Sequence, residues 1–139
     1  MMRYVAFKVF TQKYAVEIEK VQEVMVMPDY LEVPHTHEFV EGVIDLRGEI
    51  IPVINLRRRF GIGEDGGESR KYLVVIDLGT KKFGLKVDGI EGVIEATQSD
   101  ISSSEEIGEI NKEYVSNVIR KLNEIYICIN PEKISEVLS

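Results

Sequence analysis

The chain has 139 residues and nearly repeats itself, and this repeat limits its possible folds more than any other feature. Residues 13–19 (KYAVEIE) match residues 82–88 (KFGLKVD) in pattern: a base, an aromatic residue, a small residue, then alternating apolar and charged residues. A second block follows in the same order, because residues 42–55 align with 117–130 without a gap. Two blocks in the same order indicate a duplicated unit.

The repeat predicts one domain over residues 1–139 that contains two β-barrel subdomains. Their approximate bounds are 3–61 and 71–138, and each unit has the alternation of apolar and polar residues that is typical of half-buried strands. Many short strands with glycine turns and few helices favour small barrels. The stretches 63–69 and 102–106 are polar and are predicted to be linkers.

Local signals place turns and helix ends in these units. Arg47-Gly48 is predicted to form a tight hairpin turn, because glycine tolerates a positive φ. Pro52 has no N–H, so its strand is expected to lie at a sheet edge or to be bulged. Asn55 and Asn130 are predicted N-caps, and the second, followed by Pro131, begins a C-terminal helix.

Composition and charge exclude several classes of protein. The formal net charge is −7, which argues against nucleic-acid binding. No apolar run approaches the roughly 20 residues of a membrane span, and the N-terminus lacks a signal-peptide pattern. We therefore expect a cytoplasmic protein with no direct membrane insertion. The one basic run, residues 57–59, is expected to be a solvated helical turn.

The sequence offers no set of residues for catalysis. His35 and His37 have no third metal ligand nearby, so we expect a solvated loop and no metal site. Cys128 lies in an apolar alternation and is expected to be a small buried thiol. There is no phosphate-binding loop or nucleophile elbow, and no cofactor is predicted. The chain is therefore expected not to be an enzyme.

Residues 42–57 (GVIDLRGEIIPVINLR) resemble the signature of the CheW-like family, in which an aliphatic strand, an Arg-Gly turn and a proline-interrupted strand run in this order. Residues 14–24 are similar to the family's first-barrel strand and crossing segment, and residues 84–90 to its second-barrel strand. The likeness extends from about Tyr4 to Leu138.

This resemblance implies a mainly β fold of two intertwined five-stranded SH3-like barrels, with strands exchanged between them, short helical turns and a C-terminal helix. It also implies a non-enzymatic adaptor in bacterial chemotaxis signal transduction. The implied partners are the regulatory domain of a CheA-type histidine kinase and the signalling tip of a methyl-accepting chemotaxis receptor. The protein would then lie at receptor arrays on the inner face of the membrane, held there by its partners.

Matching motif positions give six candidates for contact with kinase or receptor, which the sequence does not separate: Val21, Glu23, Gly42, Arg47, Gly84 and Val93. We further expect Arg47 to pair with Glu23 and to fix the crossing segment against the hairpin turn, because a planar guanidinium binds a carboxylate through two nitrogens. The alternative is a solvated turn arginine.

Two other interpretations stay open at this point. The chain could be a CheW-like regulatory module from a larger kinase or from a coupling protein fused to a receiver domain. More distantly, it could be a small enzyme with an acidic cleft. Two carboxylates with raised pKa values in one pocket would favour the enzyme.

Overall fold

The computed structural model describes residues 1–64, 69–103 and 113–138, and these residues are mostly in strands. Parts of both predicted linkers, residues 65–68 and 104–106, lie outside them. The strands are β1 Met2–Val9, β2 Gln12–Glu17, β3 Val21–Val26, β4 Val40–Leu46, β5 Glu49–Asn55, β6 Tyr72–Asp77, β7 Lys82–Val87, β8 Gly89–Ala96, β9 Ile101–Ser103, β10 Val115–Lys121 and β11 Glu124–Ile129. The helical segments are η1 Ile18–Lys20, α1 Leu56–Arg59, η2 Gln98–Asp100, α2 Pro131–Ile134 and η4 Ser135–Leu138.

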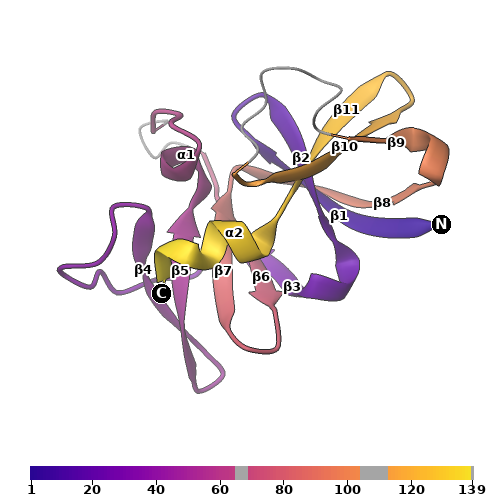
Figure 1. Cartoon of the computed structure of the whole chain (residues 1–139). Helices are drawn as coiled ribbons and strands as arrows, with labels where there is room; N and C mark the ends of the chain where they lie inside the picture. The colour runs from indigo at the N-terminus through magenta and orange to yellow at the C-terminus, as the bar shows by residue number, and fades with distance from the viewer. Residues whose placement is uncertain (65–68, 104–112, 139) are drawn as a thin grey trace.

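The strands form two sheets that lie side by side (Figure 1). The five-stranded sheet has the order β3-β6-β7-β5-β4. The chain that leaves β3 then pairs with the edge strand β4 through a bridge from Leu31 to Val43, with both hydrogen bonds at 2.9 Å. The six-stranded sheet has the order β8-β1-β2-β11-β10-β9, and η2 joins its two edge strands. The predicted mainly β fold with a C-terminal helix is confirmed, and the short β9 adds a sixth strand.

The sequence repeat is visible in how the strands pair. Hairpin β1–β2 of the first unit lies between β8 and β11 of the second unit, and hairpin β6–β7 lies between β3 and β5 in the equivalent way. The parallel pairs have the same register, because Cys128 lies opposite Ala15 as Val53 lies opposite Gly84. Each sheet therefore contains strands of both units, and the chain crosses between sheets at η1 and at Asp88.

Both faces of the exchanged hairpins are buried, which explains their nearly continuous apolar sequences. In β2, Tyr14 and Val16 pack in the core between the sheets, whereas Ala15 points into the six-stranded barrel. Gly84 is the equivalent of Ala15 in the other barrel, and a Cβ there would lie 2.5 Å from Cδ1 of Leu73. Small residues at these two positions leave room for the barrel cores.

The turn and cap predictions are confirmed, but the prediction for Pro52 is wrong. Arg47 and Gly48 both have positive φ, at 51° and 91°, and Asn130 caps α2 through its side chain. Pro52 lies in β5, which is an interior strand, and the register shift lies in β4 instead. The sheet accepts this proline because pairing between β5 and β7 begins only at Val53.

Candidate partner-binding surfaces

The predicted ion pair between Glu23 and Arg47 is present at one end of the five-stranded barrel. Arg47 is the first residue of the β4–β5 turn, and its two terminal nitrogens contact the two carboxylate oxygens of Glu23 in β3, with Nη1–Oε1 at 3.3 Å. Hydrogen bonds from Arg47 and Gln22 lower the pKa of Glu23. Nearby, Lys82 Nζ lies 2.9 Å from Glu49 Oε1. We call these four residues, Glu23, Arg47, Glu49 and Lys82, the charged end.

Val93 lies on the other barrel, at the equivalent end. It is 58% exposed and lines a hollow of about 390 Å³ together with Leu122 and Tyr126. Leu122 is 88% exposed at the tip of the β10–β11 turn, and Ile125 of β11 is also exposed. We call Val93, Leu122 and Ile125 the apolar end. An exposed group of large aliphatic side chains is typical of a protein-contact surface.

The repeat shows that these two ends are equivalent in position and different in chemistry. The Lys82–Glu49 pair of the charged end has its counterpart in Lys13–Glu124, at 3.2 Å. The Glu23–Arg47 pair has no counterpart, because the aligned positions are Gly92 and Leu122. The same backbone frame therefore presents an ion pair on one barrel and an aliphatic knob on the other.

Two of the six predicted contact residues are buried. Gly42 lies beneath the segment that connects β3 to β4, and a Cβ there would lie 2.4 Å from the carbonyl oxygen of Leu31. Gly84 lies inside the five-stranded barrel. Because both glycines are buried, a substitution there can affect a partner only by shifting the residues that pack around it. Val21 is half-buried against the core between the sheets. The role of all six residues in partner binding stays a prediction.

Exposed aliphatic residues at both barrel ends were not among the residues predicted from the sequence. Ile50 and Ile125 occupy equivalent positions, each just after a hairpin turn, and both are exposed. Ile50 also lines an apolar hollow of about 370 Å³ with Tyr30 and Leu31. The repeat alignment contains the signal for the pair, since an apolar residue recurs beside a turn in both units.

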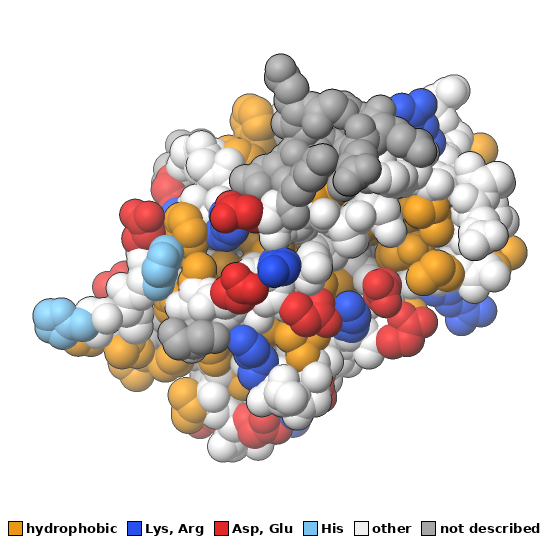
Figure 2. All heavy atoms as spheres, viewed as in Figure 1, with side chains coloured by type: hydrophobic (Ala, Val, Ile, Leu, Met, Phe, Trp, Pro, Cys, Tyr) orange, Lys and Arg blue, Asp and Glu red, His pale blue; other side chains and the backbone are white. Residues whose placement is uncertain are grey.

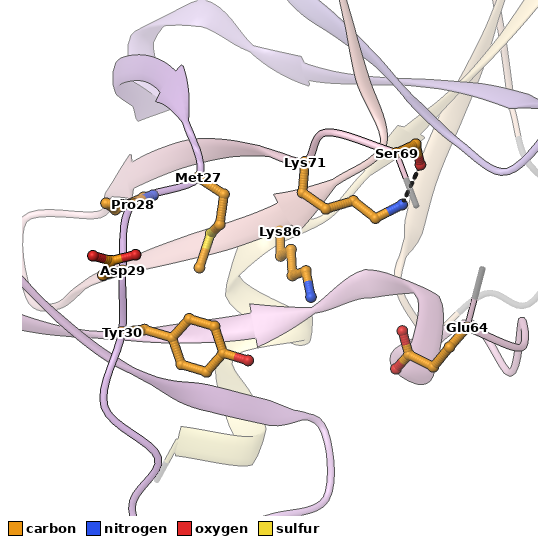
Figure 3. A pocket seen from close by; sticks show the side chains of 8 residues that line it. All are labelled: Met27, Pro28, Asp29, Tyr30, Glu64, Ser69, Lys71 and Lys86. Atoms are coloured by element: carbon orange, nitrogen blue, oxygen red, sulfur yellow. Dashed lines mark hydrogen bonds between the residues drawn. The ribbon is translucent and has the colours of Figure 1, made fainter. Parts of the chain in front are cut away.

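A hollow of about 520 Å³ lies beside the five-stranded barrel, and Figure 3 shows Tyr30, Lys71, Lys86 and Glu64 around it. Behind it the carboxylate of Glu41, only 4% exposed, binds Lys86 Nζ at 2.7 Å.

Glu41 also accepts hydrogen bonds from Tyr30 Oη at 2.9 Å and Asn55 Nδ2 at 3.1 Å, and Arg58 lies at 3.1 Å. Burial raises the pKa of Glu41, but the hydrogen bonds from Lys86, Asn55 and Tyr30 outweigh burial and lower it to about 2. Glu41 is thus a structural anion. The raised carboxylate pKa that would favour an enzyme is not found there.

The expectation that residues 57–59 form a solvated turn is wrong for Arg57 and Arg59, whereas Arg58 is exposed. Arg57 binds Asp88 with Nε–Oδ2 at 2.9 Å and is nearly buried. Arg59 lies over the rings of Phe39 and Tyr114, with its guanidinium carbon 5.3 and 5.0 Å from the two ring centres. The sequence could not reveal this, because the partners come from segments far away along the chain.

The remaining candidates for chemistry are ordinary structural residues. Both histidines are exposed, in pale blue on the outer surface in Figure 2. Within the described residues, no three His, Cys, Asp or Glu side chains come together as a metal site. Cys128 is buried as predicted, and burial raises the pKa of its thiol to about 12. A thiol of this kind is a poor nucleophile.

Among the described side chains on the face seen in Figure 2, acidic and basic residues are interspersed. Nucleic-acid binding needs a basic face. In the part of the chain that the structure describes, no helix is long and apolar enough to cross a membrane.

Comparison with known proteins supports the resemblance over nearly the whole chain. The model of the CheW-like domain matches residues 3–138. The chemotaxis protein CheW of Treponema pallidum is 32% identical over 135 residues, which cover 94% of this chain and 79% of the relative. The CheW of Thermotoga maritima is 29% identical over 137 residues, covering 96% and 87%.

A solved structure has the same fold. The crystal structure of the scaffolding protein TtCheW from Thermoanaerobacter tengcongensis has a TM-score of 0.85 and 32% sequence identity, and the match covers 93% of this chain and 88% of that one. The family match, the curated relatives and the two-barrel fold agree with one another. The chain belongs to the CheW-like domain family of chemotaxis coupling and scaffold proteins.

Proposed function

We propose that this chain is a non-catalytic adaptor that holds the regulatory domain of a CheA-type histidine kinase near the cytoplasmic tip of a methyl-accepting chemotaxis receptor. The observation that carries the proposal is the pair of equivalent barrel ends in a member of this family. One end presents the Glu23–Arg47 ion pair and the other presents the exposed side chains of Val93 and Leu122, so one small body offers two different contact surfaces. The protein would act on the cytoplasmic side of the membrane, held there by its partners.

The two kinds of partner suit different parts of the surface. A regulatory domain with the same two-barrel fold can meet a barrel end of this chain with a barrel end of its own. We propose that a receptor helical hairpin packs between the barrels through its apolar face, in the way that amphipathic helices bind to apolar grooves of other proteins. Val21, half-buried against the core between the sheets, is a candidate for that second contact.

A rigid body is suited to this task. Receptor state can reach the kinase only as a difference in contact free energy between two receptor states. Buried apolar clusters fill the space inside and between the barrels. Protein interiors of this kind have low compressibility, so a displacement at one surface also moves the opposite surface. No chemical step in this chain is needed.

The test is a mixing experiment with a purified CheA-type kinase, a receptor signalling fragment and this chain. Kinase autophosphorylation is measured with each component omitted in turn. We expect a receptor-dependent response only when this chain is present. If adding the folded protein does not make kinase autophosphorylation respond to the receptor fragment, the adaptor role with these partners is refuted.

Charge reversal then tests the charged end. Glu23→Arg and Arg47→Glu are each expected to reduce coupling, and the double variant is expected to restore it, because the pair is rebuilt with opposite polarity. A matched control reverses Lys133 and Glu136, an exposed pair at 3.5 Å on the terminal helical turns. Failure of the double variant to recover, while all variants stay folded, would show that the pair does not act as a unit.

A further inference from the structure

Within the described residues, the chain crosses between the two barrels at two points, and one of them is a single residue. The chain passes from the six-stranded to the five-stranded barrel through η1, and it returns at Asp88, between β7 and β8. The backbone at these crossings and the contacts around them, together with the apolar core between the sheets, therefore set how one barrel is oriented against the other.

Asp88 has polar contacts to both barrels. From the six-stranded side, the N–H of Phe10 in the β1–β2 turn donates to its carboxylate at 2.6 Å, and its own N–H donates to the carbonyl of Lys8 at 2.9 Å. From the five-stranded side, Arg57 Nε lies 2.9 Å and Lys71 Nζ 3.0 Å from its carboxylate. The carboxylate thus joins a backbone group of one barrel to two cations of the other.

This cluster is largely shielded from water. The side chains of Asp88, Arg57 and Lys71 are 14%, 12% and 11% exposed. Burial raises the pKa of Asp88, but the hydrogen bonds from Arg57, the Phe10 N–H and Lys71 outweigh it and lower that pKa. The guanidinium of Arg57 also lies over the ring of Phe10, 5.5 Å from its centre. Charges held in this way have strong geometric preferences, because a displaced partner leaves a buried charge uncompensated.

The other crossing has a much weaker polar contact. There Lys20 of η1 binds Glu132 of α2 at 3.0 Å, and these side chains are 29% and 52% exposed. By the repeat, Glu132 occupies the position of Arg57. Solvated pairs of this kind contribute little. On this side Ile134 of α2 is buried in the core between the sheets, and Figure 1 shows α2 lying across the front between them.

We propose that the charge cluster of Asp88, Arg57 and Lys71 fixes the orientation of the two barrels, with Asp88 as its positioning residue. Its consequence for signalling rests on the proposed adaptor function, because the charged end and the apolar end lie on different barrels. A fixed orientation keeps those two ends in one geometry. A loosened orientation lets either partner move without moving the other.

The test measures the distance between the two ends in the isolated chain. Spin labels are placed on cysteines introduced at Ile50 and Leu122, both exposed, and Cys128 does not compete because its thiol is buried. Asp88→Asn keeps the size of the side chain and removes its charge. For Asp88→Asn we expect a broadened distance distribution with a displaced maximum. For the matched control Glu132→Gln we expect the same distribution as for the parent protein.

An Asp88→Asn protein that is folded and keeps the parent distribution overturns the proposal. If Asp88→Asn does not fold, Lys71→Gln and Arg57→Lys each remove part of the cluster and are expected to broaden the distribution by less. Unchanged distributions in both would overturn the proposal equally.

The distance measurement needs no kinase or receptor, so its result does not depend on whether the adaptor role is correct. If that role also holds, Asp88→Asn is expected to keep binding to each partner singly and to lose the receptor-dependent kinase response. Loss of single-partner binding would instead indicate damage at a barrel end.

Discussion

Replacing Glu41 by glutamine removes one charge from the most shielded carboxylate beside the large hollow and leaves the packing almost unchanged. Its partners come from separate segments: Tyr30 from the β3–β4 connection, Asn55 and Arg58 from the start of α1, and Lys86 from β7. A neutral amide cannot balance Lys86 and Arg58. The variant therefore tests whether this ion cluster holds the five-stranded barrel together.

The magnitude follows from two independent routes. The pKa of Glu41 falls from 4.5 to about 2, and a shift of this size corresponds to about 3 kcal/mol of the free energy of unfolding. Removing one partner of a buried pair costs roughly 3 to 5 kcal/mol. Because Arg58 is 42% exposed and can turn to water, we place the loss just below that range, at ~2 to 3 kcal/mol.

The pH dependence has a definite sign. The folded protein holds the Glu41 pKa below its unfolded value of 4.5, so the carboxylate stabilises fully above pH 4.5 and loses its contribution as the pH falls through about 2. Glu41→Gln lacks this contribution at every pH. The difference in unfolding free energy between parent and variant should therefore shrink between about pH 5 and pH 2.

The assay is equilibrium unfolding in urea at pH 7 and at steps down to about pH 2, with the linear slope compared between proteins. The matched control is Glu49→Gln, which removes an exposed ion pair with Lys82 at 2.9 Å and is expected to cost under about 1 kcal/mol. A Glu41→Gln loss no larger than that of the control, or one that is constant over the whole pH range, refutes the reasoning.

Two further predictions concern buried small residues. Gly42→Ala should destabilise the fold more than Gly84→Ala in the same urea assay, because the new methyl group meets a backbone oxygen at 2.4 Å in the first case and a movable Leu73 side chain at 2.5 Å in the second; equal losses would contradict this. Cys128 should react with a thiol reagent at neutral pH only as fast as the protein unfolds, because its pKa is raised to about 12. Rapid reaction in native buffer would count against a buried thiol.

The repeat was the part of the fold that the sequence predicted best. Aligned blocks of residues correspond to aligned strands, down to a bulge at Gln22 in β3 and the equivalent one at Glu91 in β8. The alignment works because the backbone frame of each unit depends on local signals, namely period-two alternation and turn glycines. The prediction for Pro52 was wrong, because a missing N–H is tolerated in an interior strand wherever the second neighbouring strand has not yet begun to pair.

The Glu23–Arg47 pair could be predicted, whereas the buried ionic residues could not. The pair was inferred from motif positions of the resembling family and from the geometry of a guanidinium. Arg57 and Glu41 look like ordinary surface charges in the sequence. Their burial depends on the other chain segments that pack over them, such as the loop that carries Asp88. Such contacts between distant segments leave no periodic pattern in the sequence. The sequence pattern alone therefore predicts that these residues are exposed to solvent.

The difference between the two barrel ends extends to the backbone, and this makes the proposed adaptor directional. Gly92, which aligns with Glu23, has a φ of 108°, a conformation that residues with a Cβ rarely adopt. A side chain like that of Glu23 would therefore strain the backbone at Gly92. Leu122, at the position of Arg47, has no charge with which to pair with such a carboxylate. The two units have similar backbone frames, but in β8 the residue after the bulge has a conformation that favours glycine. We infer that the ends are not interchangeable, so a partner selected by the ion pair would meet the charged end alone.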